Sequence, residues 1–155
     1  MEDGLPDSPL TRTASAPSPG IVHLGLGAFF RAHGAIYTQQ AMAKACGDWG
    51  IIGVSLKSPT TRDALQPQGA VYHALELAPD GAELLLVTSL SAVLVAPEDP
   101  SAVWAALADP SGKIVSLTVT EKGYCHHPAS GASDRDTPAI VHDSSHDSPL
   151  SCIGI

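Results

Sequence analysis

The glycine-containing segment at residues 21–33 carries the clearest chemical signal in the chain. It reads IVHLGLGAFFRAH, a short apolar run that breaks at glycines and continues into residues suited to a helix. A strand that turns at glycines into a helix presents backbone N–H groups to a pyrophosphate. Gly25 would form the tight turn, Gly27 would let the backbone approach the phosphate oxygens, and the partial positive charge at the helix start would attract them. The segment therefore predicts a dinucleotide site.

This turn is only half of the usual fingerprint. The third glycine position holds Phe30, so a close approach between helix and strand has to come from Ala28 or Gly34 instead. A Gly-x-Gly turn also occurs in α/β proteins that bind no nucleotide. That second interpretation stays open on the turn alone.

The residues that follow the next predicted strand leave the choice of nicotinamide cofactor open. The acid that would accept the ribose 2′-hydroxyl is missing, and residues 55–58 read SLKS. Lys57 with residues 60–62 could receive the 2′-phosphate of NADP, whereas Asp63 could turn in and favour NAD. An ordinary solvated loop is the third interpretation.

The elements that must position these residues follow from hydrophobic periodicity and turn signals. The pattern predicts a Rossmann-like α/β fold with a mostly parallel sheet, flanking helices and an inserted β-hairpin, incomplete at the C-terminus. We expect strands at 21–24, 49–56, 90–95 and 114–119, a hairpin from 71–77 and 83–88 around Asp80-Gly81, helices over 32–45 and from Pro100 to Asp109, and a loop at 58–68 with at most one helical turn.

The strand at 114–119 is β-branched and uninterrupted, which is typical of a central parallel strand covered on both faces. Residues 120–125 leave its carboxyl end, where ligands bind in open α/β sheets. Glu121 is therefore a candidate to hydrogen-bond the nicotinamide ribose or to handle a proton. A carboxylate on a solvent-facing loop is the competing interpretation.

Histidines and a cysteine gather after this strand. Cys125-His126-His127 with His142 and His146 could be read as a zinc set, but their spacing matches no common structural site. A polar loop rich in histidine is the preferred interpretation, and we expect no metal.

Length and composition narrow the classes of protein. The 155 residues suit one domain over residues 20–155, preceded by a mobile extension at 1–19 that carries four prolines. A net charge of −8, without a basic cluster, argues against nucleic acid or an anionic membrane as partner. Three well-separated cysteines favour a reducing compartment, and with no export signal and no long apolar run we expect a cytoplasmic protein.

Three stretches resemble one known family, the long-chain polyol dehydrogenases that include mannitol 2-dehydrogenase and fructuronate reductase. They are residues 21–33, residues 49–54 (WGIIGV) and above all residues 114–125 (IVSLTVTEKGYC), in the family's order. The family's usual pattern has His at the position of Phe30. This departure touches the cofactor turn and leaves the resemblance intact.

The resemblance implies an N-terminal Rossmann-like domain that binds NAD or NADP, followed in complete members by a mainly helical domain. By similarity, the residues along the cofactor would be Gly25, Leu26, Gly27, Ala28, Phe29 and Arg31, with Glu121 near the nicotinamide end. Family members transfer a hydride between nicotinamide and the carbinol carbon of a sugar alcohol or hexonate, of the mannitol/fructose or mannonate/fructuronate type, without a metal.

The resemblance also implies that the catalytic residues lie elsewhere. The family's lysine base, assisted by asparagine and histidine, belongs to the helical domain, and no lysine of this chain stands in a matching context. We therefore expect a cofactor-binding portion of such an oxidoreductase, with little or no turnover alone. The alternative is a non-catalytic nucleotide-binding or protein-interaction module.

Overall fold

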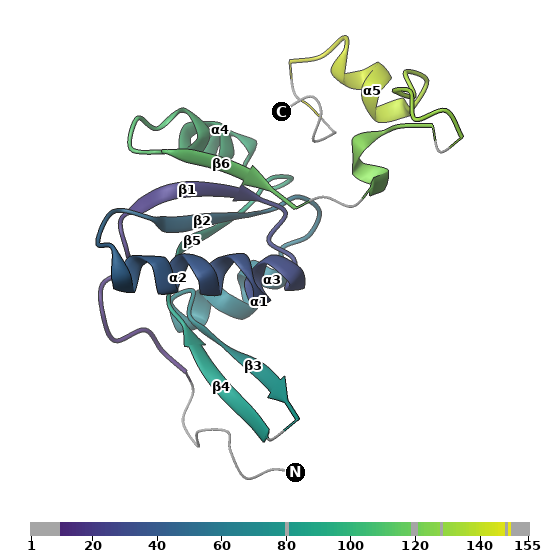
Figure 1. Cartoon of the computed structure of the whole chain (residues 1–155). Coiled ribbons are helices and arrows are strands. Elements are labelled where there is room, and N and C mark those ends of the chain that lie inside the picture. The colour runs from purple at the N-terminus through teal and green to yellow at the C-terminus, as the bar shows by residue number, and fades with distance from the viewer. Residues whose placement is uncertain (1–9, 80, 119–120, 128, 148, 150–155) are drawn as a thin grey trace. The chain divides into compact units, whose positions relative to one another are not determined.

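The structure, a computed structural model, describes residues 10–79, 81–118, 121–127, 129–147 and 149. The chain falls into two compact units, one ending at Thr118 and the other following it (Figure 1). The sequence predicted a single domain over residues 20–155, so the division after Thr118 is new information from the structure. The glycine turn belongs to the first unit and Glu121 to the second.

A parallel sheet of four strands forms the centre of the first unit (Figure 1). Its strands stand in the order β5-β2-β1-β6. They are β1 (Pro19–Leu24), β2 (Gly50–Ser55), β5 (Leu90–Val95) and β6 (Ile114–Leu117). The chain builds outward from β1 through β2 to β5 and then crosses back to β6 on the other side of β1. This reversal is the topological switch point at which open α/β sheets bind ligands.

Helices follow the strands as expected of an α/β fold, with two differences in detail. The predicted helix over 32–45 is confirmed as α2 (Gly34–Lys44). A short additional helix, α1 (Ala28–Ala32), precedes it and is separated from it by His33, which leaves helical geometry at φ −128° and ψ −73°. The expected loop at 58–68 contains α3 (Thr60–Leu65) and a 3-10 turn, η1 (Gln66–Gln68).

The helix predicted to begin at Pro100 is confirmed as α4 (Pro100–Ala108). The Asp99 side chain accepts a hydrogen bond of 2.9 Å from the Ala102 N–H, and Pro100 needs no such partner because it lacks an N–H. This helix joins β5 to β6 across one face of the sheet.

The predicted hairpin is also confirmed, as β3 (Tyr72–Ala78) and β4 (Gly81–Val87). The two strands pair antiparallel from Tyr72 opposite Val87 to Ala78 opposite Gly81. The base of the hairpin is buried, since Tyr72 and Val87 are 9% and 0% exposed. Asp80, which the sequence placed in the turn, lies outside the described residues.

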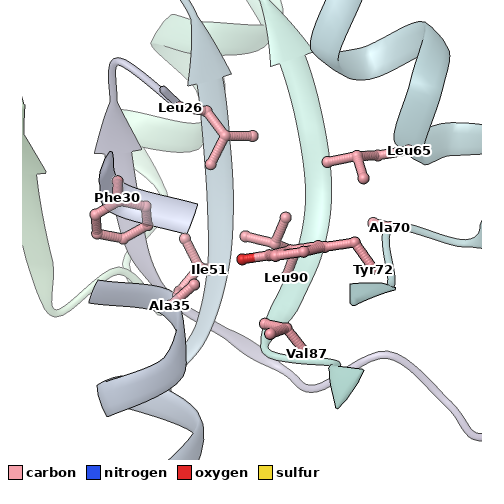
Figure 2. Close-up of a cluster of buried hydrophobic side chains, with 9 residues drawn as sticks. All are labelled: Leu26, Phe30, Ala35, Ile51, Leu65, Ala70, Tyr72, Val87 and Leu90. Atoms are coloured by element: carbon pink, nitrogen blue, oxygen red, sulfur yellow. The ribbon is translucent and has the colours of Figure 1, made fainter. Parts of the chain in front are cut away.

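Apolar side chains cover both faces of the sheet. On one face, residues from α1, α2, α3 and the hairpin base converge on β2 and β5 (Figure 2). The cluster drawn there consists of Leu26, Phe30, Ala35, Ile51, Leu65, Ala70, Tyr72, Val87 and Leu90. On the other face, Val22, Leu24 and Val54 pack with Val103 of α4. The confirmed fold class is therefore a doubly covered, Rossmann-like parallel sheet.

The prediction that 114–119 forms a central strand covered on both faces is wrong. β6 is an edge strand of the described sheet, and Ile114, Val115 and Leu117 are 46%, 57% and 41% exposed. The β-branched residues correctly indicated a strand. Whether a strand is buried depends on its neighbours, and the described part of the first unit has no strand beyond β6. Val119 lies outside the described residues.

Residues 10–18 pack against the first unit, where the sequence predicted a mobile extension over 1–19. Arg12 makes the main contact: its guanidinium donates to the carbonyl oxygens of Gly69 at 2.6 Å, Thr88 at 3.1 Å and Leu90 at 2.6 Å. Its backbone N–H also donates to Gln68. A chain segment poor in apolar residues is thus attached by hydrogen bonds. Residues 1–9 lie outside the described residues.

The second unit contains a 3-10 turn, η2 (Glu121–Tyr124), and one short helix, α5 (Pro138–Asp143). An isolated bridge pairs His126 with Ser133. Across the described residues of both units, no helix combines the length and the apolar character needed to cross a bilayer.

Candidate dinucleotide-binding turn

Gly25 turns the chain out of β1 in a way that only glycine accommodates. Its φ is +94°, and a Cβ at this position would lie 2.6 Å from the carbonyl oxygen of Thr118. The N–H groups of Gly25 and Leu26 both donate to the carbonyl of Val54 in β2, at 2.9 and 3.1 Å. The tight turn predicted for Gly25 is therefore present, and internal packing explains this glycine.

Internal packing does not explain Gly27. Its φ of −79° and ψ of 176° are open to any residue, and the nearest atom to a built Cβ is the Gly25 carbonyl oxygen at 3.8 Å. Its N–H donates to that same oxygen at 2.6 Å. The missing side chain leaves free space directly beside the turn, as the close approach of a phosphate requires.

Three backbone donors at the start of α1 have no partner in the part of the chain that the structure describes. The N–H groups of Ala28, Phe29 and Phe30 make no hydrogen bond among the described residues, and no side chain caps this helix. The first N–H groups of a helix lack intrahelical acceptors and readily bind an anion. The donors and the space at Gly27 therefore fit a pyrophosphate.

The other residues predicted along the cofactor lie in different surroundings. Leu26 is buried at 3% exposure and contributes its side chain to the core, whereas Phe29 is 69% exposed. The Arg31 guanidinium donates to the Leu26 carbonyl at 2.8 Å and so lies beside the turn. Glu121 begins η2 in the second unit, and its side chain is outside those described. Its predicted place near the nicotinamide stays a prediction.

A groove of about 590 Å³ adjoins the turn. It begins beside Ala28 and Arg31 and continues between α2 and the hairpin, along Tyr37 and Leu75. Tyr72 is among its lining residues, and the Tyr72 hydroxyl donates to the Arg31 carbonyl at 2.7 Å. The turn therefore opens onto a crevice of the first unit.

Sequence reasoning missed His23 and its partners beneath the turn. The imidazole is 1% exposed, and its Nδ1 and Nε2 atoms lie 2.9 Å from Ser116 Oγ and Thr118 Oγ1. Phe30 stacks on the ring with centroids 3.3 Å apart. Burial lowers the pKa of His23 to about 4, although a hydrogen bond with the Gly25 backbone raises it. One polar residue inside an apolar strand was the available signal.

Two of the residues predicted to select the cofactor, Arg62 and Asp63, take part in ion pairs after β2. The Arg62 guanidinium pairs with the carboxylates of Glu98 and Asp63, and these hydrogen bonds raise the pKa of Arg62. The Lys57 side chain, by contrast, is exposed. The described residues therefore present Lys57, rather than Arg62, as the accessible cation of this segment.

The histidine-rich tail shows no metal geometry in its described part. His142 and His146 stack with centroids 4.0 Å apart, and His142 approaches Asp143 at 3.4 Å. Within the described ranges, no three His, Cys, Asp or Glu side chains converge on a position for a metal ion.

Residues 19–148 match the family model of the mannitol dehydrogenase Rossmann domain. The chain belongs to this family. The yeast mannitol dehydrogenase DSF1 of Saccharomyces cerevisiae is 41% identical over 130 residues, which cover 82% of this chain and 26% of the relative. The D-mannonate oxidoreductase of Escherichia coli is 41% identical over 139 residues, covering 86% and 29%. The resemblance inferred from the three stretches is thereby confirmed.

Solved structures agree with this assignment. Pseudomonas fluorescens mannitol 2-dehydrogenase, in a ternary complex with NAD and D-mannitol, superposes with a TM-score of 0.82 at 39% identity and covers 89% of this chain. A substrate-free D-sorbitol dehydrogenase gives 0.80 at 36% identity and covers 90%. These matches span 29% and 30% of the solved chains. This mannitol dehydrogenase Rossmann domain thus corresponds to less than a third of its relatives' length.

Proposed function

We propose that this Rossmann domain binds a nicotinamide dinucleotide with the pyrophosphate at the turn from Gly25 to Ala28. The observation that carries the proposal is Gly27, where neither backbone geometry nor packing requires a glycine. It stands next to three N–H groups that have no partner among the described residues. A Cβ at Gly27 would occupy the space in which phosphate oxygens approach the backbone. The related mannitol 2-dehydrogenase complex with NAD supports this ligand class.

Within the complete polypeptide, the domain would serve an oxidoreductase that transfers hydride between the dinucleotide and a sugar alcohol or hexonate. The names of the relatives, mannitol dehydrogenases and a D-mannonate oxidoreductase, support this substrate class. The bound dinucleotide would supply the hydride chemistry, while Gly25, Gly27 and the start of α1 bind and orient it. The 155-residue chain is expected to bind cofactor without appreciable turnover, because no lysine occupies the family's catalytic motif.

The choice between NAD and NADP depends on the segment after β2. Asp63, the candidate partner of a ribose 2′-hydroxyl, is held by Arg62 at 2.8 Å. Lys57 is the exposed cation that could meet a 2′-phosphate. We therefore propose that the domain accepts NADP as well as NAD. Titration of the wild-type chain and of Lys57→Ala with both dinucleotides tests this, because the variant should lose affinity for NADP alone.

Calorimetric titration with NAD and NADP tests the binding proposal. Gly27→Ala should weaken binding by about tenfold or more, equivalent to about 1.4 kcal/mol, while the free energy of unfolding changes by less than about 1 kcal/mol. Ala43→Ser adds one atom at an exposed site of α2 and should leave binding intact. A folded wild-type chain that binds neither dinucleotide at millimolar concentration would refute the proposal. Clear turnover of NADH with fructose or fructuronate would refute the expected lack of catalysis.

A protein-interaction module is the second candidate, and the hairpin favours it. Leu75 and Leu77 of β3 are 59% and 77% exposed, and Leu84 and Leu86 of β4 lie on the same face at 37% and 45%. An exposed apolar face of this kind favours association. Sedimentation analysis discriminates, since a monomer at high concentration would count against self-association.

The expected compartment is the cytoplasm. Among the described cysteines, Cys46 and Cys125 are both free thiols, which suits a reducing environment. The acidic net charge of −8 gives no support to nucleic acid or an anionic membrane as partner.

A further inference from the structure

His23 occupies the position in β1 from which a side chain can reach the glycine turn from below. It lies two residues before Gly25 and pairs in parallel register with Ser116 of β6. Its ring is fully enclosed, with Phe30 of α1 stacked on one face at an interplanar angle of 9°. Strand β1, strand β6 and helix α1 therefore meet at one imidazole.

The hydrogen bonds around this imidazole determine which nitrogen carries the proton. The Thr118 hydroxyl donates its one hydrogen to the Gly25 carbonyl, with Oγ1 and O separated by 2.9 Å. Towards His23 the Thr118 oxygen can then only accept, so Nε2 must be the N–H donor. Nδ1 is left as an acceptor for the Ser116 hydroxyl. The neutral Nε2–H tautomer thus gives both ring nitrogens and both hydroxyls a partner.

This arrangement holds the peptide between Gly25 and Leu26 on two sides. The Leu26 N–H donates to Val54 of β2, and the Gly25 carbonyl accepts from Thr118 at the end of β6. Glycine at positive φ has wide backbone freedom, so few intrinsic barriers oppose rotation of this peptide. The Thr118 hydroxyl, together with the Gly27 N–H that donates to the same oxygen at 2.6 Å, therefore holds this carbonyl in one orientation.

We propose that His23 is a positioning residue for the dinucleotide: as the Nε2–H tautomer it orients the Thr118 hydroxyl towards the Gly25 carbonyl, which sets the turn before the cofactor binds. The inference rests on the proposed function of the turn. In this arrangement the His23 imidazole lies behind the backbone donors of the turn. It connects β1 with β6, the two strands at the switch point of the sheet.

Substitutions at Thr118 test the proposal. Thr118→Val keeps the shape and removes the hydroxyl, and it should weaken dinucleotide binding by about tenfold. Thr118→Ser restores the hydroxyl and should bind within about twofold of wild type, that is, within roughly 0.4 kcal/mol. Thr38→Val is the matched control, because it removes the same kind of bond, from a threonine hydroxyl to the Gly34 carbonyl at 2.8 Å, within α2. It should leave binding unchanged.

Nitrogen NMR of the His23 ring in the wild-type chain supplies a readout that needs no ligand and no variant. The Nε2–H tautomer is expected, and Thr118→Val should mix the two tautomers while Thr118→Ser should not. An Nδ1–H tautomer, or a folded Thr118→Val variant that binds as tightly as wild type, would overturn the inference. A wild-type chain that binds neither dinucleotide but shows Nε2–H would instead refute the proposed function.

Discussion

The imidazole of His23 and the phenyl ring of Phe30 stack with centroids 3.3 Å apart and planes inclined by 9°. Phe30 stands where the family's usual pattern has histidine, and it fills the core rather than the turn, at 9% exposure. Gly34 makes room for it, since a Cβ there would lie 2.4 Å from a ring carbon of Phe30. The third small residue of the fingerprint is thus replaced by a ring and a glycine that fit together.

Removal of the Phe30 ring should destabilise the domain and expose His23 to water. Phe30→Ala is expected to lower the free energy of unfolding by about 3 to 5 kcal/mol, as for other buried phenylalanines. The pKa of His23 should rise from about 4 towards its ordinary value of 6.5, because burial is what lowers it. Denaturant unfolding and NMR titration measure the two effects. Phe29→Ala, at a 69% exposed site, should change neither.

Acid should destabilise the domain through His23. The unfolded chain takes up a proton near pH 6.5, whereas the folded chain does so only near pH 4, so stability falls as the pH decreases between these values. From pH 7 to pH 5 the loss should be about 2 kcal/mol. Urea unfolding at both pH values measures it. His23→Gln should reduce the difference by that amount, and an unchanged pH dependence would contradict the prediction.

Alanine should destabilise the domain at Gly25 and be tolerated at Gly27. Gly25→Ala places a Cβ 2.6 Å from the Thr118 carbonyl at φ +94°, and should lower the free energy of unfolding by about 2 kcal/mol or more. Gly27→Ala is compatible with its backbone and should change stability by less than about 1 kcal/mol in either direction. Denaturant unfolding of both variants measures these changes. Equal losses in the free energy of unfolding would contradict the prediction.

Arg12 should contribute measurably to stability although it lies outside the predicted domain. Arg12→Ala removes donors from three carbonyls and should cost about 2 kcal/mol. Arg12→Lys should recover little, since an ammonium cannot match the planar fork. Thermal unfolding compares them with Lys44→Ala, an exposed position in the last turn of α2. If Arg12→Ala left the thermal stability unchanged, the hydrogen bonds of Arg12 would not attach residues 10–18 to the rest of the first unit.

The features predicted correctly are those that local chemistry specifies. The hairpin followed from alternating residues around a turn, and the start of α4 followed from Asp99-Pro100, where the cap is made three residues away by Ala102. Features that depend on contacts between distant parts of the chain were not predicted. Residues 10–18 carry no apolar signal, yet Arg12 finds carbonyls at Gly69 and Leu90 that only folding brings together.

The sequence by itself determined the parallel α/β class, the turn at Gly25-Leu26-Gly27 and the family, because these depend on residue types at short spacing. Only the tertiary structure decided that β6 lies at an edge, that Gly25 and not Gly27 is demanded by packing, and that His23 reaches Thr118. Their partners stand more than 90 positions apart in the chain. A contact over that separation exists only once the sheet has set its strand order.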